Sequence, residues 1–286
     1  LPLPKLKRRI EDEGIREIIV ATPPSVDGDA VVLAGEIGAV ISIKPQFQQD
    51  LLYVIPGEEH YGRPLYRGVT NNESGFPHCI LVNQDGNRFS DESIGQQVGS
   101  MLRNFDVRQH RYVNVPCFLV FDQTYLDKYG LGSIQPGQDV PGWLVRNQTI
   151  KGLAKELGID GDGLAKTIRR FNRFAVAGKD RDFGRGEFPF ANSVSGDLTH
   201  QPNPNLGPLN QPPYYGLPLE PAAAGSTRLM TNEFAQVVHL RGHTIPGLYA
   251  CGSASAHSYG VGYQAGCELG GAMTFGYLAA RHAAAR

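Results

Sequence analysis

The chain has 286 residues, of which 41% are hydrophobic and 19% charged, so it is long enough for one large or two ordinary packed domains. Its formal net charge of −1 excludes a global electrostatic field that would hold nucleic acid or an anionic membrane. No apolar run approaches the roughly 18 residues of a membrane-spanning helix, and the first residues do not form a secretory signal.

The four cysteines lie far apart along the chain. Cys79, Cys117, Cys251 and Cys267 form no C-x-x-C pair and no cysteine–histidine spacing typical of a zinc site. We therefore expect buried free thiols in a reducing, cytoplasmic compartment, with neither disulfides nor a bound metal.

Regular elements are predicted at three places in the first half of the chain. Small and apolar residues predict a helix over 30–39. Residues 80–83 and 87–89 are predicted to form a β-hairpin, because Asp85-Gly86 between them is a strong turn signal. The continuous apolar run at 117–122 predicts a buried strand.

Two helices and a long irregular segment follow. A helix over 150–157 is predicted to be capped by Thr149 and ended by Gly158. A second helix is predicted after Asp162 from a stripe of apolar residues spaced three or four apart: Leu164, Ile168, Phe171 and Ala175. Residues 178–213 are crowded with Pro, Asn and Gly, which predicts an interdomain connection or a substrate-facing loop.

The last part of the chain reads as strand, glycine-rich loop and helix. The strand is predicted at 247–252, the loop contains Gly260, Gly262 and Gly266, and the helix is predicted at 269–281. Glycines allow close approach of a ligand to backbone N–H groups, and a helix N-terminus carries a partial positive charge. Glycine spacing alone fits a ligand site and a tight turn equally well.

The residues themselves carry a more specific signal. Residues 245–254 (IPGLYACGSA) and 266–281 (GCELGGAMTFGYLAAR) resemble the C-terminal flavin-binding segment of FAD-dependent oxidoreductases of the fumarate reductase and 3-ketosteroid dehydrogenase type. Shorter stretches along most of the chain are also similar to segments of this family: 27–39, 82–92, 119–122, 180–186 and 213–215.

The resemblance implies an α+β fold with two parts. Residues 1–45 and 212–286 would be the remnant of a Rossmann-type FAD-binding domain, and residues 46–211 an inserted α+β substrate (cap) domain. The family's G-x-G-x-x-G after a first strand is absent from this sequence. The resemblance therefore implies the back part of a longer enzyme, with a missing N-terminal FAD-binding segment or chain as its partner.

The family's chemistry implies FAD as cofactor and a small, apolar, carbonyl-bearing substrate, steroids included. A hydride would move between flavin N5 and a carbon–carbon bond next to the carbonyl. Tyr263 is similar in position to the tyrosine of a Y-x-S-G motif and is the candidate proton-transfer residue. The resemblance also implies five residues that would contact FAD: Gly252, Ser253, Gly266, Glu268 and Leu269.

Departures from the family narrow the chemistry. Gln264 and Gly95 occupy positions where fumarate reductases have arginines, so a dicarboxylate substrate is not expected. Gln96 replaces a tyrosine of the Δ1-ketosteroid dehydrogenases, and Ala265 replaces the serine of the motif around Tyr263.

Four polar residues near these motifs are not the first choice for catalysis, although Tyr259 is an alternative proton donor to Tyr263. Arg88 and Glu92 are expected to form a structural ion pair. His257 and Tyr259 could line the pocket. A rival hypothesis is a non-catalytic fragment or subunit, which would bind FAD only together with the missing nucleotide-binding half.

Overall fold

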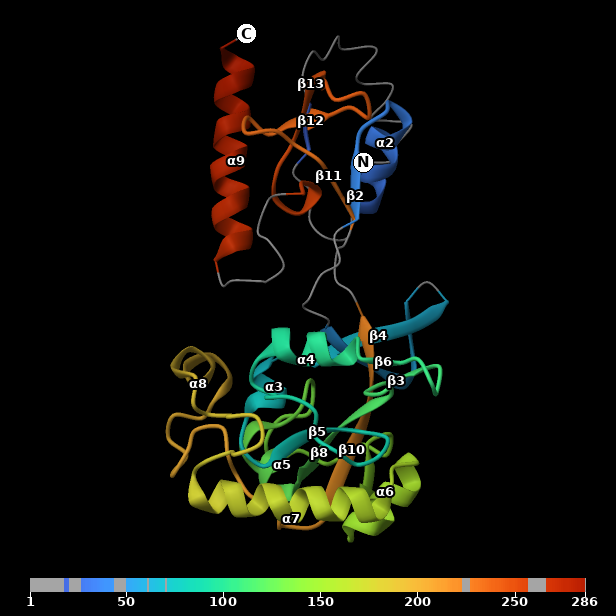
Figure 1. Ribbon diagram of the computed structural model, residues 1–286, viewed down its shortest axis with the longest axis vertical. Coiled ribbons are helices and arrows are strands. Elements are labelled where there is room, and N and C mark those ends of the chain that lie inside the picture. Colours follow the sequence, from blue (N-terminus) through green and yellow to red (C-terminus); the bar gives the residue numbers. More distant parts are fainter. Residues whose placement is uncertain are drawn as a thin grey trace. The chain divides into compact units, whose positions relative to one another are not determined.

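The chain divides into two compact units in the computed structural model (Figure 1). Unit 1 combines residues 1–46 with 223–286, and unit 2 is the continuous segment 47–222. The residues that the structure describes are 18–20, 27–43, 50–60, 62–69, 71–222, 227–256 and 266–285.

A six-stranded antiparallel sheet forms the centre of unit 2. Its strands run in the order β4-β3-β10-β8-β5, and β9 pairs with β10 outside this path. The strands are β3 (Asp50–His60), β4 (Arg63–Val69), β5 (Cys79–Asn83), β8 (Cys117–Asp122), β9 (Val145–Asn147) and β10 (Tyr214–Ala222).

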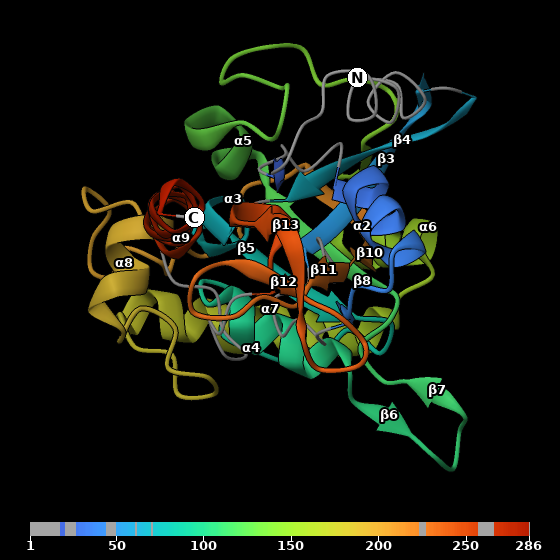
Figure 2. The ribbon, with the colours of Figure 1, turned by 90° about the horizontal axis from the view of Figure 1, so that it is seen from above.

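Helices cover both faces of this sheet, and Figure 1 shows α6 and α7 along one side with α3 and α4 on the other. The short hairpin β6–β7 projects from the body of unit 2 in Figure 2. The helices and hairpin strands are α3 (Asn71–Gly75), α4 (Gly95–Leu102), α5 (Gln123–Tyr129), α6 (Ile150–Leu157), α7 (Gly161–Ala177), α8 (Pro189–Ser195), β6 (Phe105–Asp106) and β7 (Arg111–Tyr112).

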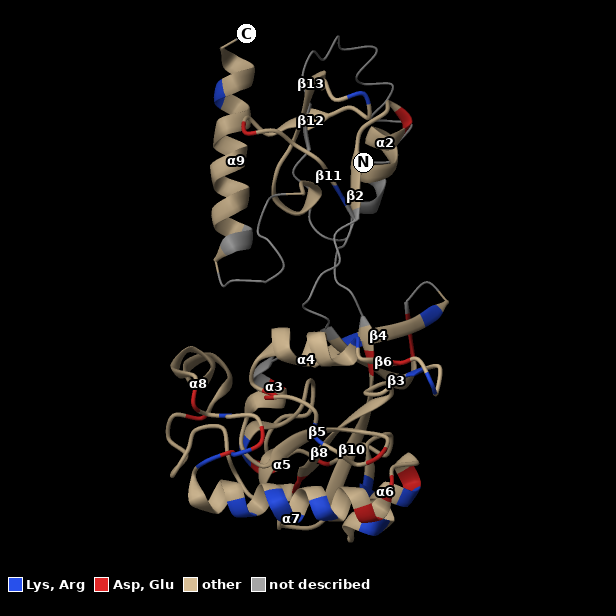
Figure 3. Cartoon of the chain, in the orientation of Figure 1, with Lys and Arg blue, Asp and Glu red and all other residues tan. Residues whose placement is uncertain are grey.

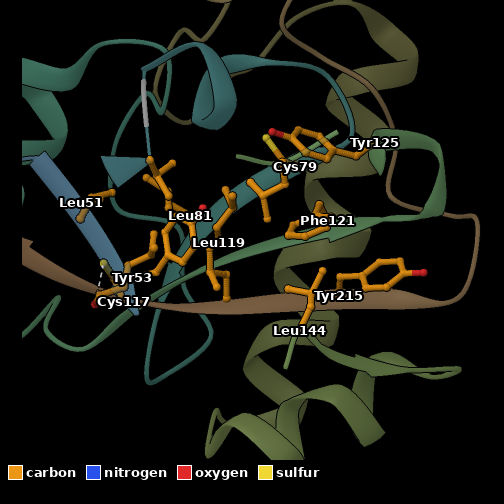
Figure 4. Close-up of a cluster of buried hydrophobic side chains, with 14 of the residues drawn as sticks. Leu51, Tyr53, Cys79, Leu81, Cys117, Leu119, Phe121, Tyr125, Leu144 and Tyr215 are labelled. Carbon is orange, nitrogen blue, oxygen red and sulfur yellow. Dashed lines mark hydrogen bonds between the residues drawn. The ribbon is translucent and has the colours of Figure 1, made fainter. Parts of the chain in front are cut away.

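Strands β5 and β8 are buried on both faces because their side chains alternate between two cores. Ile80 and Val120 join the core under α6 and α7, whereas Leu81, Leu119 and Phe121 join the opposite core. Figure 4 shows the second core, in which the Phe121 ring lies 4.9 Å from Tyr125 and 5.5 Å from Tyr215, centroid to centroid. Two-sided burial explains the continuous apolar runs, and the predicted strand at 117–122 is confirmed.

Unit 1 contains a three-stranded sheet in the order β1-β13-β12 and a two-stranded sheet of β11 and β2. β1 pairs with β13 in parallel, and β12 pairs with β13 in antiparallel orientation. Its elements are β1 (Ile18–Val20), α2 (Asp27–Glu36), β2 (Ile41–Ile43), β11 (Thr227–Leu229), β12 (Gln236–Val238), β13 (Thr244–Ala250), the 3-10 helix η1 (Gly252–Ala254) and α9 (Cys267–Ala284).

Local sequence signals identified two helices of unit 2, α6 and α7. Helix α6 begins after Thr149, whose side chain accepts a hydrogen bond from the Gly152 N–H, and ends at Gly158 in the left-handed conformation, as predicted. Helix α7 is also confirmed, but it begins at Gly161, before Asp162, and its N-cap is Asp160.

Three predicted elements have different boundaries in the structure. Helix α2 spans Asp27–Glu36 instead of 30–39, because Gly38 turns the chain at φ +84° against the His239 ring. Strand β13 begins at Thr244 and ends at Ala250, and α9 begins two residues earlier than expected, at Cys267. The predicted irregular segment 178–213 contains one helix, α8.

The prediction that a second hairpin strand follows the turn at Asp85-Gly86 is wrong. The turn is present, with Gly86 at φ +72° and its N–H donating to the Asn83 carbonyl over 2.9 Å. Residues 87–89 form no strand, because the chain turns inward and is held by side chains that include the buried Arg88. The neighbour of β5 in the sheet is β8.

The chain leaves unit 2 after Ala222, whereas the sequence placed this boundary between residues 211 and 212. The proline-rich segment before it is not a connection, since Leu206 and Leu209 are buried in the core beneath α7. Strand β10 then runs through the middle of the sheet before the chain returns to unit 1.

Unit 2 is continuous in sequence and has its own cores, so it is predicted to fold alone. We expect the free energy of unfolding of a protein of residues 47–222 to lie within about 0.5 kcal/mol of that of unit 2 in the full chain. Contributions from independent parts of a protein usually add to within this margin. Trp143, the single tryptophan, lies in unit 2, with its ring centroid 6.0 Å from that of Tyr53. Its fluorescence during urea unfolding therefore reports the unfolding of unit 2. A loss of more than about 1 kcal/mol on excision would contradict independent folding.

Candidate functional site

The segment after β13 contains the first two residues implied to contact FAD. Strand β13 ends at Ala250, and Gly252 and Ser253 begin the 3-10 helix η1. Gly252 adopts φ +61°, and a Cβ built on it would lie 3.3 Å from the Ala272 Cβ of α9. A glycine here therefore fits both the left-handed backbone and the close approach of η1 to α9.

The N-terminus of α9 is the strongest local feature for binding an anionic or electron-rich group. Gly266 is the N-cap at φ +87°, and it provides no side chain to accept hydrogen bonds from the first turn. A Cβ built on Gly266 would meet no atom within 4 Å. The first N–H groups of α9, which no side chain caps, and the helix dipole fit a flavin ring edge or a phosphate.

The five predicted cofactor residues therefore fall on two elements that pack together, η1 and the first turn of α9. Leu269 is 74% exposed, whereas the side chain of Glu268 lies outside the described residues. Tyr263, Gln264, Ala265, His257 and Tyr259 all lie in 257–265, which is outside the described residues, so the role of Tyr263 stays a prediction.

Unit 2 contains a buried ionic cluster, of which the sequence predicted only one ion pair. The predicted Arg88–Glu92 pair is confirmed as a bidentate contact, with Nε to Oε1 at 2.6 Å and Nη2 to Oε2 at 2.7 Å. Arg88 Nη2 also donates to Asp180 Oδ2 at 2.9 Å, and Arg185 Nη1 donates to Glu92 Oε2 at 3.0 Å. Sequence reasoning missed that the motifs at 82–92 and 180–186 meet in this way.

Two cations and two carboxylates balance within this cluster. Burial favours the neutral form of Glu92, but the guanidinium groups of Arg88 and Arg185 outweigh burial and hold the pKa of that carboxyl below its ordinary value. The pKa of Asp180 is lowered in the same way, with burial opposing Arg88. All four side chains are therefore charged near neutral pH.

The cluster ties distant segments of unit 2 together. Arg185 also donates to the backbone carbonyls of Cys79 and Phe76, at 2.9 and 2.7 Å. The guanidinium carbon of Arg88 lies 4.8 Å from the centroid of the Phe171 ring in α7. The arrangement joins β5, the turn after it, α7 and the loop at 180–186, which indicates a structural role.

The three cysteines whose side chains the structure describes give no sign of reactivity. Cys79, Cys117 and Cys251 are buried free thiols, and the side chain of Cys267 lies outside the described residues. Burial raises the pKa of Cys79 and of Cys117 to about 12, so both stay protonated. Among the described residues, no group of three metal-binding side chains comes together, and no helix is long and apolar enough to cross a membrane.

Comparisons with known proteins agree with the motifs. A family model described as an FAD binding domain matches residues 5–271. A 4-oxocyclohexanecarboxylate 2-dehydrogenase of Sinomonas cyclohexanicum is 36% identical over 92% of this chain and 46% of its own length. A 3-oxosteroid 1-dehydrogenase of Mycobacterium tuberculosis is 35% identical over 90% of this chain and 46% of its own length.

A solved structure has the same fold. The 3-ketosteroid Δ1-dehydrogenase from Sterolibacterium denitrificans, in complex with 1,4-androstadiene-3,17-dione, matches 98% of this chain and 51% of its own, with 32% identity and a TM-score of 0.80. The chain thus spans about half the length of the curated relatives it matches. With a match over most of its length, it belongs to the FAD binding domain family of flavoprotein oxidoreductases.

Proposed function

We propose that this chain forms part of an FAD-dependent dehydrogenase that acts on a carbon–carbon bond next to a ring ketone. The observation that carries the proposal is the uncapped, glycine-started N-terminus of α9, in a chain that matches the family over residues 5–271. FAD, when bound, supplies a hydride acceptor beside the substrate.

The substrate class is proposed from what the relatives' names share. One relative is named for 4-oxocyclohexanecarboxylate and another for 3-oxosteroids, and both molecules carry a ketone on a six-membered ring. A dicarboxylate such as fumarate is not favoured, since Gly95 begins α4 where a fumarate reductase would offer an arginine. A cyclic ketone is therefore the proposed substrate.

The two units are proposed to divide the work. Unit 1 would hold the flavin with Gly252, Ser253, Gly266, Glu268 and Leu269, as the remnant of a Rossmann-type domain. Unit 2, with its six-stranded sheet covered on both faces, would be the substrate (cap) domain. Tyr263 would take the proton from the carbon next to the carbonyl while the hydride leaves the neighbouring carbon, so that a C=C bond forms.

A second candidate is a chain that is inactive alone and needs a nucleotide-binding half. The sequence has no N-terminal G-x-G-x-x-G, and the relatives carry a further portion about as long as this chain. We therefore propose that the isolated chain binds FAD weakly or not at all. Tight, stoichiometric quenching of FAD fluorescence by the chain alone would contradict this.

The function is tested on the chain assembled with a nucleotide-binding half, as the flavin-loaded complex. We expect 4-oxocyclohexanecarboxylate or a 3-oxosteroid to bleach the flavin absorbance without oxygen. Gly266→Val places a β-branched residue at φ +87° and is expected to lower the FAD content at least tenfold. Gly142→Val is the matched control, because a Cβ there meets nothing within 4 Å and the site lies in unit 2. A loaded complex that no cyclic ketone reduces would overturn the proposed activity.

A further inference from the structure

The hairpin of β6 and β7 carries exposed apolar side chains where it projects from unit 2 (Figure 2). Phe105 and Tyr112 are directly paired across the two strands, and their rings meet edge to face with centroids 5.1 Å apart. These two residues are 43% and 50% exposed, and Val107 in the connecting loop is 73% exposed. Three large side chains of this kind on so short an element form a patch, and exposed apolar patches mark contact sites.

The hairpin is held in shape by hydrogen bonds at its tip and at its base. Asp106 Oδ1 accepts from the backbone N–H groups of Arg108 and Gln109, over 2.8 and 3.1 Å, which fixes the turn. At the base, the Val113 N–H donates to the Asn104 carbonyl over 2.8 Å. The exposed apolar side chains are therefore presented by a preformed turn.

The same segment is basic in a chain that is slightly acidic overall. Residues 103–112 contain three arginines and one aspartate, hence a net charge of +2, whereas the whole chain carries −1 and the remainder therefore −3. Arg108 is exposed, and Arg111 pairs over 3.5 Å with Asp85, which is half exposed. Positive charge beside exposed rings is the combination that anionic lipid headgroups attract. The negative remainder is repelled by such a surface, so the charges also orient the hairpin toward it.

A lipid surface fits this element better than a partner protein does. A stable protein–protein interface takes about 800 Å² and roughly 20–30 residues from each partner. The hairpin offers the ten residues 103–112. At a membrane surface, by contrast, a narrow element suffices: aromatic rings lie at the level of the headgroups, and arginines keep their charge among the phosphates while their stems lie against apolar chains.

We propose that the β6–β7 hairpin anchors the protein reversibly to anionic lipid headgroups. Phe105, Val107 and Tyr112 enter the interface between the headgroups and the acyl chains. Arg108 and Arg111 contact the lipid phosphates. This anchor depends neither on FAD nor on the identity of the substrate, so it is tested on the full chain by itself.

The test sediments the chain with vesicles of phosphatidylcholine and phosphatidylglycerol in equal parts, and vesicles of phosphatidylcholine alone are the uncharged reference. We expect binding to the anionic vesicles that weakens as salt is raised, because salt screens the attraction. Val107→Glu is expected to lower the affinity about tenfold or more, because it removes an apolar contact and adds a repelled charge. Arg108→Glu is expected to lower it at least as far, since it reverses a charge at the surface.

Two substitutions on α7 are the matched controls. Val176→Glu makes the same change as Val107→Glu at a position that is 74% exposed. Arg173→Glu reverses a charge in the row of exposed cations that Figure 3 shows as repeated blue segments along α7. Both variants should bind the anionic vesicles as the unaltered chain does. The fluorescence of Trp143 checks that each variant is folded before its binding is measured.

Val107→Trp gives an independent readout of where the hairpin lies. Its added emission should shift to shorter wavelength with anionic vesicles and be quenched by brominated lipid, because the indole enters the interface. Absence of binding by the unaltered chain, or binding that survives both Val107→Glu and Arg108→Glu, overturns the proposal. Equal losses in the α7 controls also overturn it. So does self-association without lipid that Val107→Glu dissociates, since the hairpin would then serve a second copy.

Discussion

Glu92→Gln is expected to destabilise unit 2 by about 3–5 kcal/mol, the usual loss when one partner of a buried ion pair is removed. Glu92 is the shared acceptor of two buried cations, Arg88 and Arg185. Arg88 Nη1 and Arg185 Nε already have no hydrogen-bond partner among the described residues, so no spare acceptor can replace the lost charge. The loss is measured by urea unfolding followed through Trp143 fluorescence.

The matched control is Asp182→Asn, in the same loop as Asp180. Asp182 accepts from Arg170 Nε at 2.7 Å, but this arginine side chain is 51% exposed. A solvent-exposed pair contributes about 1 kcal/mol or less, so Asp182→Asn should stay within that range. Equal losses in the two variants would show that the buried cluster has no special part in stability.

Acid unfolding gives a second readout of the same cluster. The folded pKa of Glu92 lies below its unfolded value, so its contribution to stability is present above the unfolded pKa of about 4.5 and is lost as pH falls through the folded pKa. In Glu92→Gln this titration is gone. We therefore expect a smaller fall in unfolding free energy below pH 4.5 in the variant, which a mere packing defect would not cause.

Two signals that act within a few residues were interpreted correctly from the sequence. The cap at Thr149 and the stop at Gly158 act inside one helix, and Arg88 and Glu92 are four residues apart in one motif. The partner Asp180 lies 92 residues from Arg88, and no local pattern joins them. Their meeting depends on how α7 and the following loop pack on the sheet, which periodicity does not encode.

Strand β10 was missed for a reason that its pairing explains. Pro218 and Pro221 lie inside it, and proline is normally excluded from central strands. Residues 217–219 pair with β8 alone and residues 220–222 with β3 alone. Each proline therefore has a strand on one side only, and no second strand requires the N–H group that proline lacks. The strand crosses the sheet by changing neighbours, and the predicted domain boundary was placed before it instead of after it.

The local backbone of the proposed cofactor segment could be predicted because it depends on a short run of residues. Glycine conformation and the start of a helix follow from 247–270, and the structure places Gly252 against α9 and Gly266 at its N-cap. The chemistry depends on which side chains surround a substrate, and this spacing is set by tertiary structure. The role of Tyr263 is therefore proposed from resemblance alone.

Tyr263→Phe is expected to slow flavin reduction by about 10²–10⁴-fold while FAD content stays unchanged, the range for losing a general acid–base group. The phenol has an ordinary pKa of about 10, so it serves as a base near neutral pH only beside a cation or hydrogen-bond donor that lowers this value. Phenylalanine keeps the ring and removes the hydroxyl, so a change in rate at constant flavin content isolates proton transfer from packing.

The rate is measured in single turnover by stopped flow without oxygen, with the loaded complex and a 3-oxosteroid or 4-oxocyclohexanecarboxylate. Tyr112→Phe, a half-exposed tyrosine on β7, is the matched control and should leave the rate unchanged. Tyr259→Phe tests the neighbouring hydroxyl of the same loop as an alternative donor. The unaltered enzyme should slow as pH falls and the phenolate is protonated, and Tyr263→Phe should lose this dependence. An unchanged rate constant in Tyr263→Phe would leave that residue as a wall of the pocket and assign proton transfer to another group.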